Sequence, residues 1–342
     1  MTGPPCNSHE TNRNMAILVV GGAGYIGSHM SLLLAQQEIE FVILDDLSSG
    51  RRESVEGFEL VEGRLDDVAL LSALFSSRNI SAVMHFAAFI EVGESVVNPA
   101  KYYQNNVHAT QSLLDCMVAH EIKNFIFSST AAIFGTPEYT PIDEMHPKQP
   151  INPYGRTKWM VEQILDDYDH AYGLKSVCLR YFNAAGADPG GRTGECHDPE
   201  THLIPLALQA ASGRQEHISI FGDDYETADG TCIRDYVHVE DLSQAHLLAI
   251  KYLEEGGQSG RFNLGNGRGF SVREVIDAAE RATGRKIEIA HGDRREGDPP
   301  VLVADSTQAR EVLGWEPKFG ALDMILDHAW GWEQRHFLGK EA

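Results

Sequence analysis

One segment near the start constrains the fold most, because a short apolar run leads directly into closely spaced glycines. The run Ile17–Val20 is followed by GGAGYIG at 21–27 and then by an amphipathic stretch. Gly21, Gly24 and Gly27 allow a tight turn between a strand and a helix, with the backbone open to a pyrophosphate at the helix N-terminus. The segment therefore predicts a dinucleotide-binding strand–turn–helix unit.

A second apolar run, Phe41–Leu44, ends at Asp45, 18 residues after Gly27. A carboxylate at this place accepts hydrogen bonds from a ribose 2′-hydroxyl and repels a 2′-phosphate. The sequence therefore favours NAD over NADP as the cofactor.

Further short apolar runs alternate with helical patterns. They lie at Ala82–Phe86, Phe125–Phe127 and Ser176–Leu179. Strands separated by helices indicate βαβ units and a parallel sheet. We expect an α/β chain with a Rossmann-type, doubly wound parallel sheet.

The amino-acid composition changes after Asn183, where Gly, Pro and polar residues become frequent. This change indicates that the chain passes into a second lobe. Helical patterns follow near 203–213, 240–254, 271–283 and 321–336. The expected domains are a disordered tail at 1–15, an NAD-binding domain at 16–185 and a smaller mixed α/β substrate lobe at 186–342. Within residues 186–342, some elements are expected to pack with the first domain.

Charge and cysteine content exclude some classes of protein. The 342 residues carry 28 basic and 50 acidic side chains, a formal charge of −22, which argues against nucleic-acid binding. No apolar run approaches the roughly 18 residues of a membrane span, so no membrane partner is expected. Five scattered cysteines without a C-x-x-C pair fit a reducing, cytoplasmic location.

A tyrosine and a lysine mark a candidate catalytic helix. Asn152 and Pro153 suit its N-cap and first position, and Tyr154 and Lys158 stand four residues apart on one face. Lowering a tyrosine pKa from about 10 to about 7 needs roughly 4 kcal/mol. An ammonium about 5 Å away supplies roughly 3 kcal/mol at an effective dielectric constant of about 20. The helix N-terminus adds about 0.3–1 kcal/mol, and a bound nicotinamide cation would add more. Tyr154 is therefore predicted to be a general base near neutral pH.

Thr130 follows the predicted strand that contains Phe125–Phe127. Ligands of open α/β sheets bind at the carboxyl ends of the strands, which places the Thr130 hydroxyl beside Tyr154. An ordinary turn explains a cluster of serine and threonine equally well.

The chain also resembles the extended short-chain dehydrogenase/reductase family, and within it the nucleotide-sugar epimerases. The resemblance extends from about Ile17 to about Trp332. It is carried by GGAGYIGSH, HFAAFIEVGES, YYQNNV, NFIFSSTAAIFG, NPYGRTK, LRYFNAAGA, IFGDDYETADGTCIRDYVHVEDL, FNLGNG and RREGDPP. It implies interconversion of UDP-glucose and UDP-galactose by transient C4 oxidation with retained NAD. It also implies a homodimer packed through helices near 100–119 and 153–172.

Roles for single residues follow from the same resemblance. The implied catalytic residues are Tyr154, Lys158 and Thr130. The implied cofactor contacts are Gly21, Gly24, Tyr25, Ile26, Gly27, Asp45, Leu65, Phe86, Ala87, Ala88, Asn105, Ser128, Tyr154, Lys158 and Phe182. The implied UDP-sugar contacts are Thr130, Tyr154, Asn183, Leu203, Phe221, Arg234, Arg295 and Asp298.

Several alternatives stay open at this point. The resemblance implies that residue size at Leu302 decides whether N-acetylated sugars such as UDP-N-acetylglucosamine enter. The same catalytic residues could also act on a UDP-pentose such as UDP-xylose or UDP-arabinose. A 4,6-dehydratase needs a further acid–base pair, but the positions after Thr130 are Ala131 and Ala132. A non-catalytic NAD-binding protein would not need Tyr154.

A histidine-containing segment, HDPETH at 197–202, raises the question of a metal site. Its spacing is not a usual ligand pattern and the implied reaction needs no metal. No metal is predicted.

Overall fold

The computed structural model describes residues 15–295 and 298–339. The predicted disordered tail, apart from Met15, lies outside the described residues.

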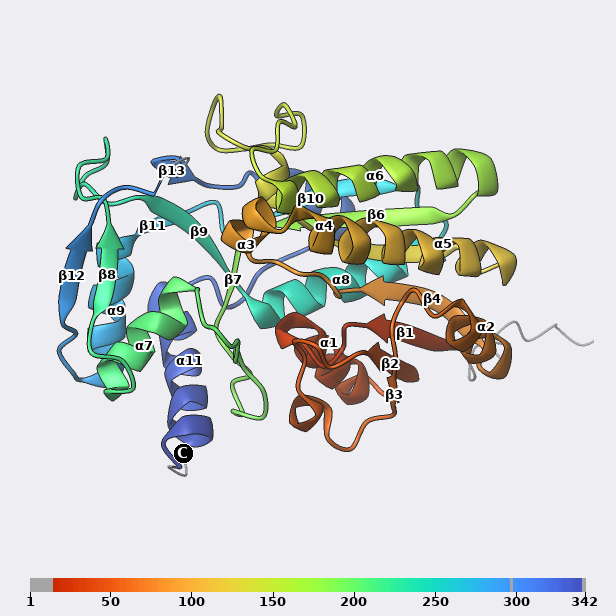
Figure 1. The fold of residues 1–342 in the computed structure, drawn as a ribbon, viewed down its shortest axis with the longest axis horizontal. Helices are drawn as coiled ribbons and strands as arrows, with labels where there is room; N and C mark the ends of the chain where they lie inside the picture. Colours follow the sequence, from red (N-terminus) through yellow and green to blue (C-terminus); the bar gives the residue numbers. More distant parts are fainter. Residues whose placement is uncertain (1–14, 296–297, 340–342) are drawn as a thin grey trace, which may run out of the picture.

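A seven-stranded sheet in which every neighbouring pair is parallel forms the larger lobe, as predicted (Figure 1). Its spatial order is β10-β6-β5-β4-β1-β2-β3. The bounds are β1 (Ala16–Val20), β2 (Phe41–Asp45), β3 (Leu60–Glu62), β4 (Ile80–His85), β5 (Asn124–Thr130), β6 (Lys175–Tyr181) and β10 (Gly260–Leu264). The chain order reverses between β1 and β4, and ligands of such sheets bind beyond the strand ends at this reversal.

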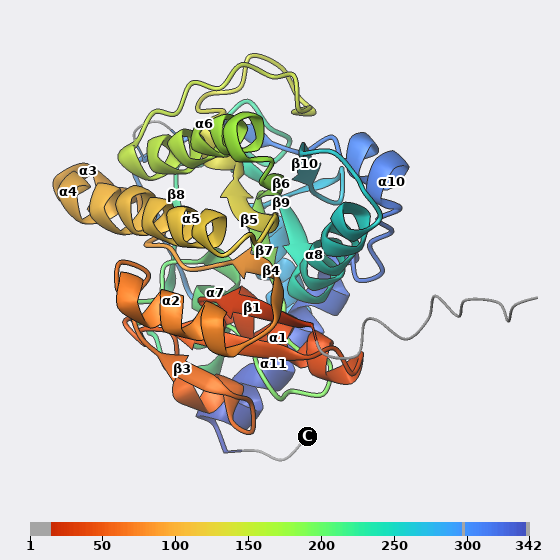
Figure 2. The ribbon, with the colours of Figure 1, turned by 90° about the vertical axis from the view of Figure 1, so that its right-hand side faces the viewer.

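Helices cover both faces of this sheet, as Figure 2 shows. One apolar core lies between the sheet and α1 (Tyr25–Gln36), α8 (Val239–Glu254) and α10 (Thr307–Leu313). The other lies between the sheet and α2 (Val68–Ser77), α5 (Thr110–Ala119) and α6 (Pro153–Tyr172). Strands buried on both faces read as continuous apolar runs, which explains why their positions were visible in the sequence.

Shorter helical segments connect these elements. They are η1 (Arg52–Val55), α3 (Val92–Val97), α4 (Pro99–Tyr102), the π-helical η2 (Tyr103–Ala109) and η3 (Ala131–Ile133).

The smaller lobe is mixed α/β, as predicted. Strand β9 (Ile233–His238) pairs in parallel with β7 (Asn183–Ala185) and β13 (Val301–Leu302), and antiparallel with β11 (Gly269–Ser271). A separate pair joins β8 (Ile218–Phe221) to β12 (Ile289–Gly292). The lobe's core is completed by α7 (Leu203–Ser212), α9 (Val272–Thr283) and α11 (Leu322–Phe337).

Two elements from the later part of the chain belong to the first sheet. Helix α8 packs against β5 and β6, and β10 pairs with β6 at the sheet edge. Among the helices of residues 15–295 and 298–339, none has the length and hydropathy that a membrane crossing requires.

Candidate functional site

A cavity of about 840 Å³ lies at the carboxyl ends of the parallel strands. The larger lobe contributes the glycine loop after β1 and the ends of β4, β5 and β6, and the smaller lobe contributes residues such as Arg234 and Asp298. In Figure 1 this edge of the sheet faces the smaller lobe. The volume is within the range of protein sites for small organic molecules.

The glycines of the loop are required by close backbone approach. Gly21 has φ +75°, and a Cβ there would lie 2.4 Å from the backbone nitrogen of Ala87. A Cβ on Gly27 would lie 2.2 Å from the carbonyl oxygen of Gly21. Gly24 is the N-cap of α1 and has no side chain to occupy the helix end. The first amides of α1 therefore present an anion site of the kind that holds a pyrophosphate.

Asp45 ends β2 beside this loop and is 8% exposed. One carboxylate oxygen accepts from the Ala23 amide at 2.9 Å, and the other accepts from the Leu47 amide at 2.8 Å. Burial raises the pKa of Asp45, although these two hydrogen bonds oppose the rise. Each oxygen retains a second lone pair, so the carboxylate can still accept from the hydroxyls of a ribose.

The residues predicted for NAD all line this one cavity. They are Gly21, Gly24, Tyr25, Ile26, Gly27, Asp45, Leu65, Phe86, Ala87, Ala88, Asn105, Ser128, Tyr154, Lys158 and Phe182. The tight glycine cradle and the carboxylate at the second strand fit a dinucleotide whose ribose carries a free 2′-hydroxyl.

The start of α6 has the predicted capping geometry. The side-chain oxygen of Asn152 accepts from the Gly155 amide at 2.8 Å, and Pro153 occupies the first turn. This cap fixes the helix end that carries Tyr154. One turn further on, Lys158 is 3% exposed, and its Nζ donates to the Ser128 carbonyl of β5 at 2.9 Å. The candidate base and its lysine are therefore held against the strand that ends at Thr130.

The pKa of Tyr154 in the chain by itself differs from the sequence-based expectation. Burial raises it to about 12, although a hydrogen bond from the Thr130 hydroxyl opposes the rise. Burial also lowers the pKa of Lys158 to about 7. The expected value near 7 for Tyr154 includes a bound nicotinamide cation and stays a prediction; in the chain by itself, desolvation disfavours the charged form of both partners.

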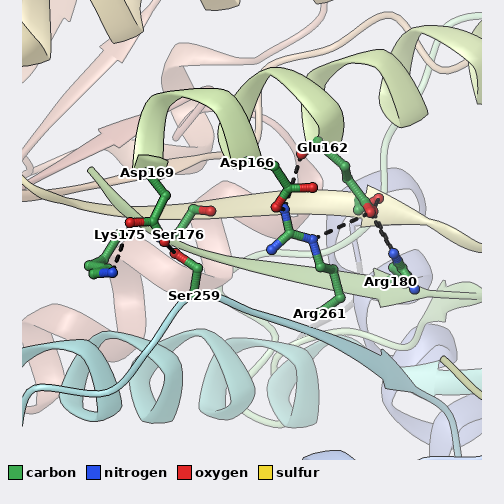
Figure 3. Close-up of polar contacts among 9 residues, drawn as sticks. Glu162, Asp166, Asp169, Lys175, Ser176, Arg180, Ser259 and Arg261 are labelled. Atoms are coloured by element: carbon green, nitrogen blue, oxygen red, sulfur yellow. Dashed lines mark hydrogen bonds and ion pairs between the residues drawn. The ribbon is translucent and has the colours of Figure 1, made fainter. Parts of the chain in front are cut away.

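A charge network around the buried pair of Glu162 and Arg180 joins α6 to the sheet (Figure 3). Glu162, two turns after Tyr154 on α6, accepts from the Ser129 hydroxyl of β5 at 2.5 Å. The same carboxylate accepts from Arg180 of β6 at 3.0 Å (Nε) and 2.6 Å (Nη2). Its backbone carbonyl accepts from Arg261 of β10 at 3.0 Å. Glu162 therefore ties α6 to three neighbouring strands and fixes Tyr154 relative to Thr130.

The predicted substrate residues divide into two groups. Thr130, Tyr154, Asn183, Arg234 and Asp298 line the cavity. Leu203, Phe221 and Arg295 are not part of its lining.

The second group has identifiable surroundings. Phe221 is 39% exposed, and the Arg295 guanidinium lies 4.1 Å from its ring centroid. Leu203 begins α7 and packs against the core of the smaller lobe. The cavity as described therefore does not extend to these three predicted contacts.

Sequence reasoning also missed residues that line the cavity. Glu195, His197 and His202 approach it from the loop before α7. The ligand-bearing atoms of Glu195, His197, Glu200 and His202 all lie within 4.8 Å of one another. The residue types alone predict this cluster only weakly, because the four side chains come together only through the conformation of the loop.

Comparisons with known proteins agree with this geometry. Residues 17–265 match the model of the NAD dependent epimerase/dehydratase family. The chain is 52% identical over 322 residues to the UDP-glucose 4-epimerase of Halalkalibacterium halodurans, covering 94% of this chain and 96% of that protein.

Solved structures show the same similarity. The UDP-glucose 4-epimerase from Brucella ovis, in complex with NAD, has a TM-score of 0.91 and 52% identity, covering 92% of this chain and 97% of that one. The enzyme from Bifidobacterium longum, in complex with NAD+ and UDP, has a TM-score of 0.90 and 36% identity, covering 95% and 100%. The predicted Rossmann-type fold is confirmed, and the chain belongs to the NAD-dependent epimerase/dehydratase family.

Proposed function

We propose that this chain is an NAD-dependent UDP-glucose 4-epimerase, which interconverts UDP-glucose and UDP-galactose. The observation that carries the proposal is the placement of Tyr154, Lys158 and Thr130 in the same cavity as the glycine cradle. The identity of about half the residues to a curated UDP-glucose 4-epimerase over nearly the whole chain supports the substrate.

Tyr154 is the proposed acid–base group at the sugar 4-hydroxyl. When bound, NAD would supply an acceptor for the C4 hydride and, once reduced, the donor from which the sugar regains a hydride on its opposite face. Tyr154 takes the hydroxyl proton in the first direction and gives it back in the second. Thr130 lines the same cavity as Tyr154 and lowers the pKa of that phenol, so its hydroxyl stands where it can also bind the sugar 4-oxygen. Lys158 would hold the ribose next to the nicotinamide.

The high pKa of Tyr154 in the chain by itself imposes a requirement on this proposal. A phenol with a pKa of about 12 is almost entirely protonated at neutral pH. Positive charge in the cavity must favour its ionised form, and the protonated form of Lys158 is one source of that charge. Activity therefore depends on the protonation of both residues.

Polar residues of the smaller lobe are the proposed anchor for UDP. The Asn183 side chain donates to the Asp235 carbonyl at 2.9 Å, which fixes its amide at the cavity wall. Arg234 is held by the Pro299 carbonyl at 2.9 Å and by Asp298 at 3.4 Å, and offers positive charge to a diphosphate. An anchored UDP leaves the sugar free to turn between the two hydride transfers.

The competing 4,6-dehydratase reaction is not favoured. It removes water across C5 and C6 and needs a second acid–base pair near the sugar. The positions after Thr130 are Ala131 and Ala132, which line the cavity and carry no titratable group. The oxidised sugar is therefore expected to be reduced again rather than dehydrated.

One experiment tests the activity and the sugar class together. The full chain is incubated separately with UDP-galactose, UDP-N-acetylgalactosamine and UDP-xylose, and the 4-epimers are separated by chromatography. UDP-glucose is the expected main product of the series. Turnover of the N-acetylated sugar would show that Leu302, at the cavity wall, leaves room for the acetamido group. Dehydrated products, or none, would contradict the proposal.

We also propose a homodimer packed through helices near 100–119 and 153–172. Met160 of α6 is 37% exposed, and Val96 and Val97 of α3, the short helix before 100–119, are 60% and 83% exposed. Helix α3 lies against α6, so these side chains belong to one side of the molecule. A second copy of the chain would remove them from water.

A cytoplasmic location is proposed as well. Cys116, Cys178, Cys196 and Cys232, the cysteines of the described residues, are all free thiols. Free thiols persist in a reducing compartment.

A further inference from the structure

The loop that leads into α7 brings two histidines and two glutamates to one point beside the cavity. Its residues 194–202 are called the 194–202 loop below. Glu195 and Glu200 have side chains that are 7% and 5% exposed, while those of His197 and His202 are 20% and 40% exposed. The sequence-based expectation of no metal considered the segment from His197 onward and omitted Glu195.

The donor atoms are gathered closely enough to surround a single ion. Nδ1 of His202 lies 2.8 Å from Oε1 of Glu195 and 3.2 Å from Oε1 of Glu200. Nδ1 of His197 lies 3.2 Å from Oε1 of Glu195 and 3.7 Å from Oε2 of Glu200. Ligands about 2.0–2.2 Å from a tetrahedral Zn²⁺ are about 3.3–3.6 Å from each other. The four measured separations lie on both sides of that range.

A second observation concerns His197 alone. Its Nδ1 is buried and makes no hydrogen bond within the described residues, although two carboxylates are near. In a cluster held only by protons, each imidazole N–H would point at a carboxylate oxygen. Nδ1 of His197 instead lies 3.2 Å from Oε1 of Glu195 and 3.7 Å from Oε2 of Glu200 without the geometry of a hydrogen bond to either. A buried polar atom without a partner is costly, and a metal ion at that point would satisfy it.

The surroundings hold the ligands in place. The backbone carbonyl of Glu195 accepts from the Trp332 indole of α11 at 3.0 Å. Oε1 of Glu200 accepts from the amides of Thr201 and His202 at 2.8 Å and 2.9 Å. Ligands that are positioned by such contacts bind metal more tightly than free side chains do.

We propose that Glu195, His197, Glu200 and His202 form a binding site for one divalent transition-metal ion, with Zn²⁺ as the best match. Two imidazole nitrogens and two carboxylate oxygens suit a borderline ion, whereas Ca²⁺ and Mg²⁺ prefer oxygen ligands only. Four protein ligands are typical of a structural site. The ion would fix the 194–202 loop against the cavity and takes no part in the proposed reaction.

Protons are the competing occupants of this site. The carboxylates of Glu195 and Glu200 lie 3.2 Å and 3.7 Å from Nδ1 of His197, so they also favour a protonated imidazole there. The two carboxylates thus attract positive charge to this point. A metal ion and a pair of imidazolium groups give the cluster the same net charge, so binding must be measured directly.

The test uses the full chain after treatment with a chelator. The protein is dialysed against Zn²⁺ or Co²⁺, and bound metal is counted by elemental analysis. We expect one ion per chain and, for Co²⁺, the intense visible absorption of four-coordinate cobalt. His197→Gln and Glu200→Gln each remove one ligand and are expected to weaken Co²⁺ binding by about 100-fold or more. Circular dichroism establishes that each variant is folded.

His291→Gln is the matched control, because it removes a histidine that pairs with a carboxylate, Asp223 at 3.3 Å, outside the cluster. Its metal binding and spectrum are expected to equal those of the parent. The proposal is overturned if the parent binds no ion above background, if the cobalt spectrum is that of six-coordinate metal, or if the ligand variants bind as the parent does.

Discussion

The proposed role of Tyr154 needs a hydroxyl, which phenylalanine lacks. We expect Tyr154→Phe to lower kcat by about 10²–10⁴-fold, the usual contribution of a general acid–base group. The affinity for UDP-sugar should change little, since Asn183 and Arg234 form the proposed anchor. Steady-state kinetics and calorimetric titration with UDP-glucose measure the two quantities. Tyr172→Phe, at the exposed end of the same helix, is the control. Unchanged turnover in Tyr154→Phe would falsify the assignment.

Lys158 gives a prediction about pH and stability. Burial lowers its pKa in the folded chain from 10.5 to about 7. Between these values the unfolded chain holds the proton and the folded chain does not, so this residue makes the folded state more stable as pH rises. The free energy of unfolding of the parent, minus that of Lys158→Met, should therefore increase from about pH 7 to about pH 10.

Denaturant unfolding at a series of pH values measures this difference. The matched control is Lys251→Met, which removes an exposed lysine from α8. A difference that stays flat or falls for Lys158→Met would contradict burial as the cause. Lys158→Met should also lose turnover. The two measurements together would show that Lys158 lowers stability but is needed for the reaction.

At the scale of elements, Glu162 and Arg180 join α6 to the sheet. Their side chains are 0% and 3% exposed, so removing one charge leaves the other buried without a partner. Glu162→Gln is expected to lower the free energy of unfolding by about 3–5 kcal/mol. Replacing both, with Glu162→Gln and Arg180→Met, should restore much of that loss.

Denaturant titration measures these changes. Asp323→Asn is the control, because its pair with Arg281 is exposed on both sides and should be worth less than about 1 kcal/mol. An equal effect at both pairs would show that burial does not determine the contribution of the Glu162 pair.

The sequence predicted those elements and residues whose signals are local. Buried parallel strands such as β1 appear as apolar runs, and the cap at Asn152 appears in neighbouring residues. Strand β3 is three residues long and partly exposed, so it has no such run. The pKa of Tyr154 depends on burial by the rest of the chain, and the grouping of Glu195 with His202 depends on a loop conformation. Neither can be found from residue spacing.

At the scale of the whole molecule, measuring the molar mass in solution tests the proposed dimer. Light scattering after size exclusion is expected to give twice the chain mass. Val97→Asp places a charge on the 83% exposed valine of α3 and should shift the protein toward the monomer. Val312→Asp, on α10 at the opposite face of the sheet, is the control and should leave the mass unchanged. If the parent protein has the mass of a monomer at working concentration, the proposed dimer is wrong.

The position of β10 at the edge of the large sheet has a consequence for biosynthesis. A ribosome completes the glycine loop and α6 long before it reaches residue 264, so the emerging chain presents β6 with β5 on one side and no β10 on the other. An unpaired edge of this kind invites association with other chains. Nascent or truncated products that end before β10 are therefore the forms of this protein that most need a chaperone.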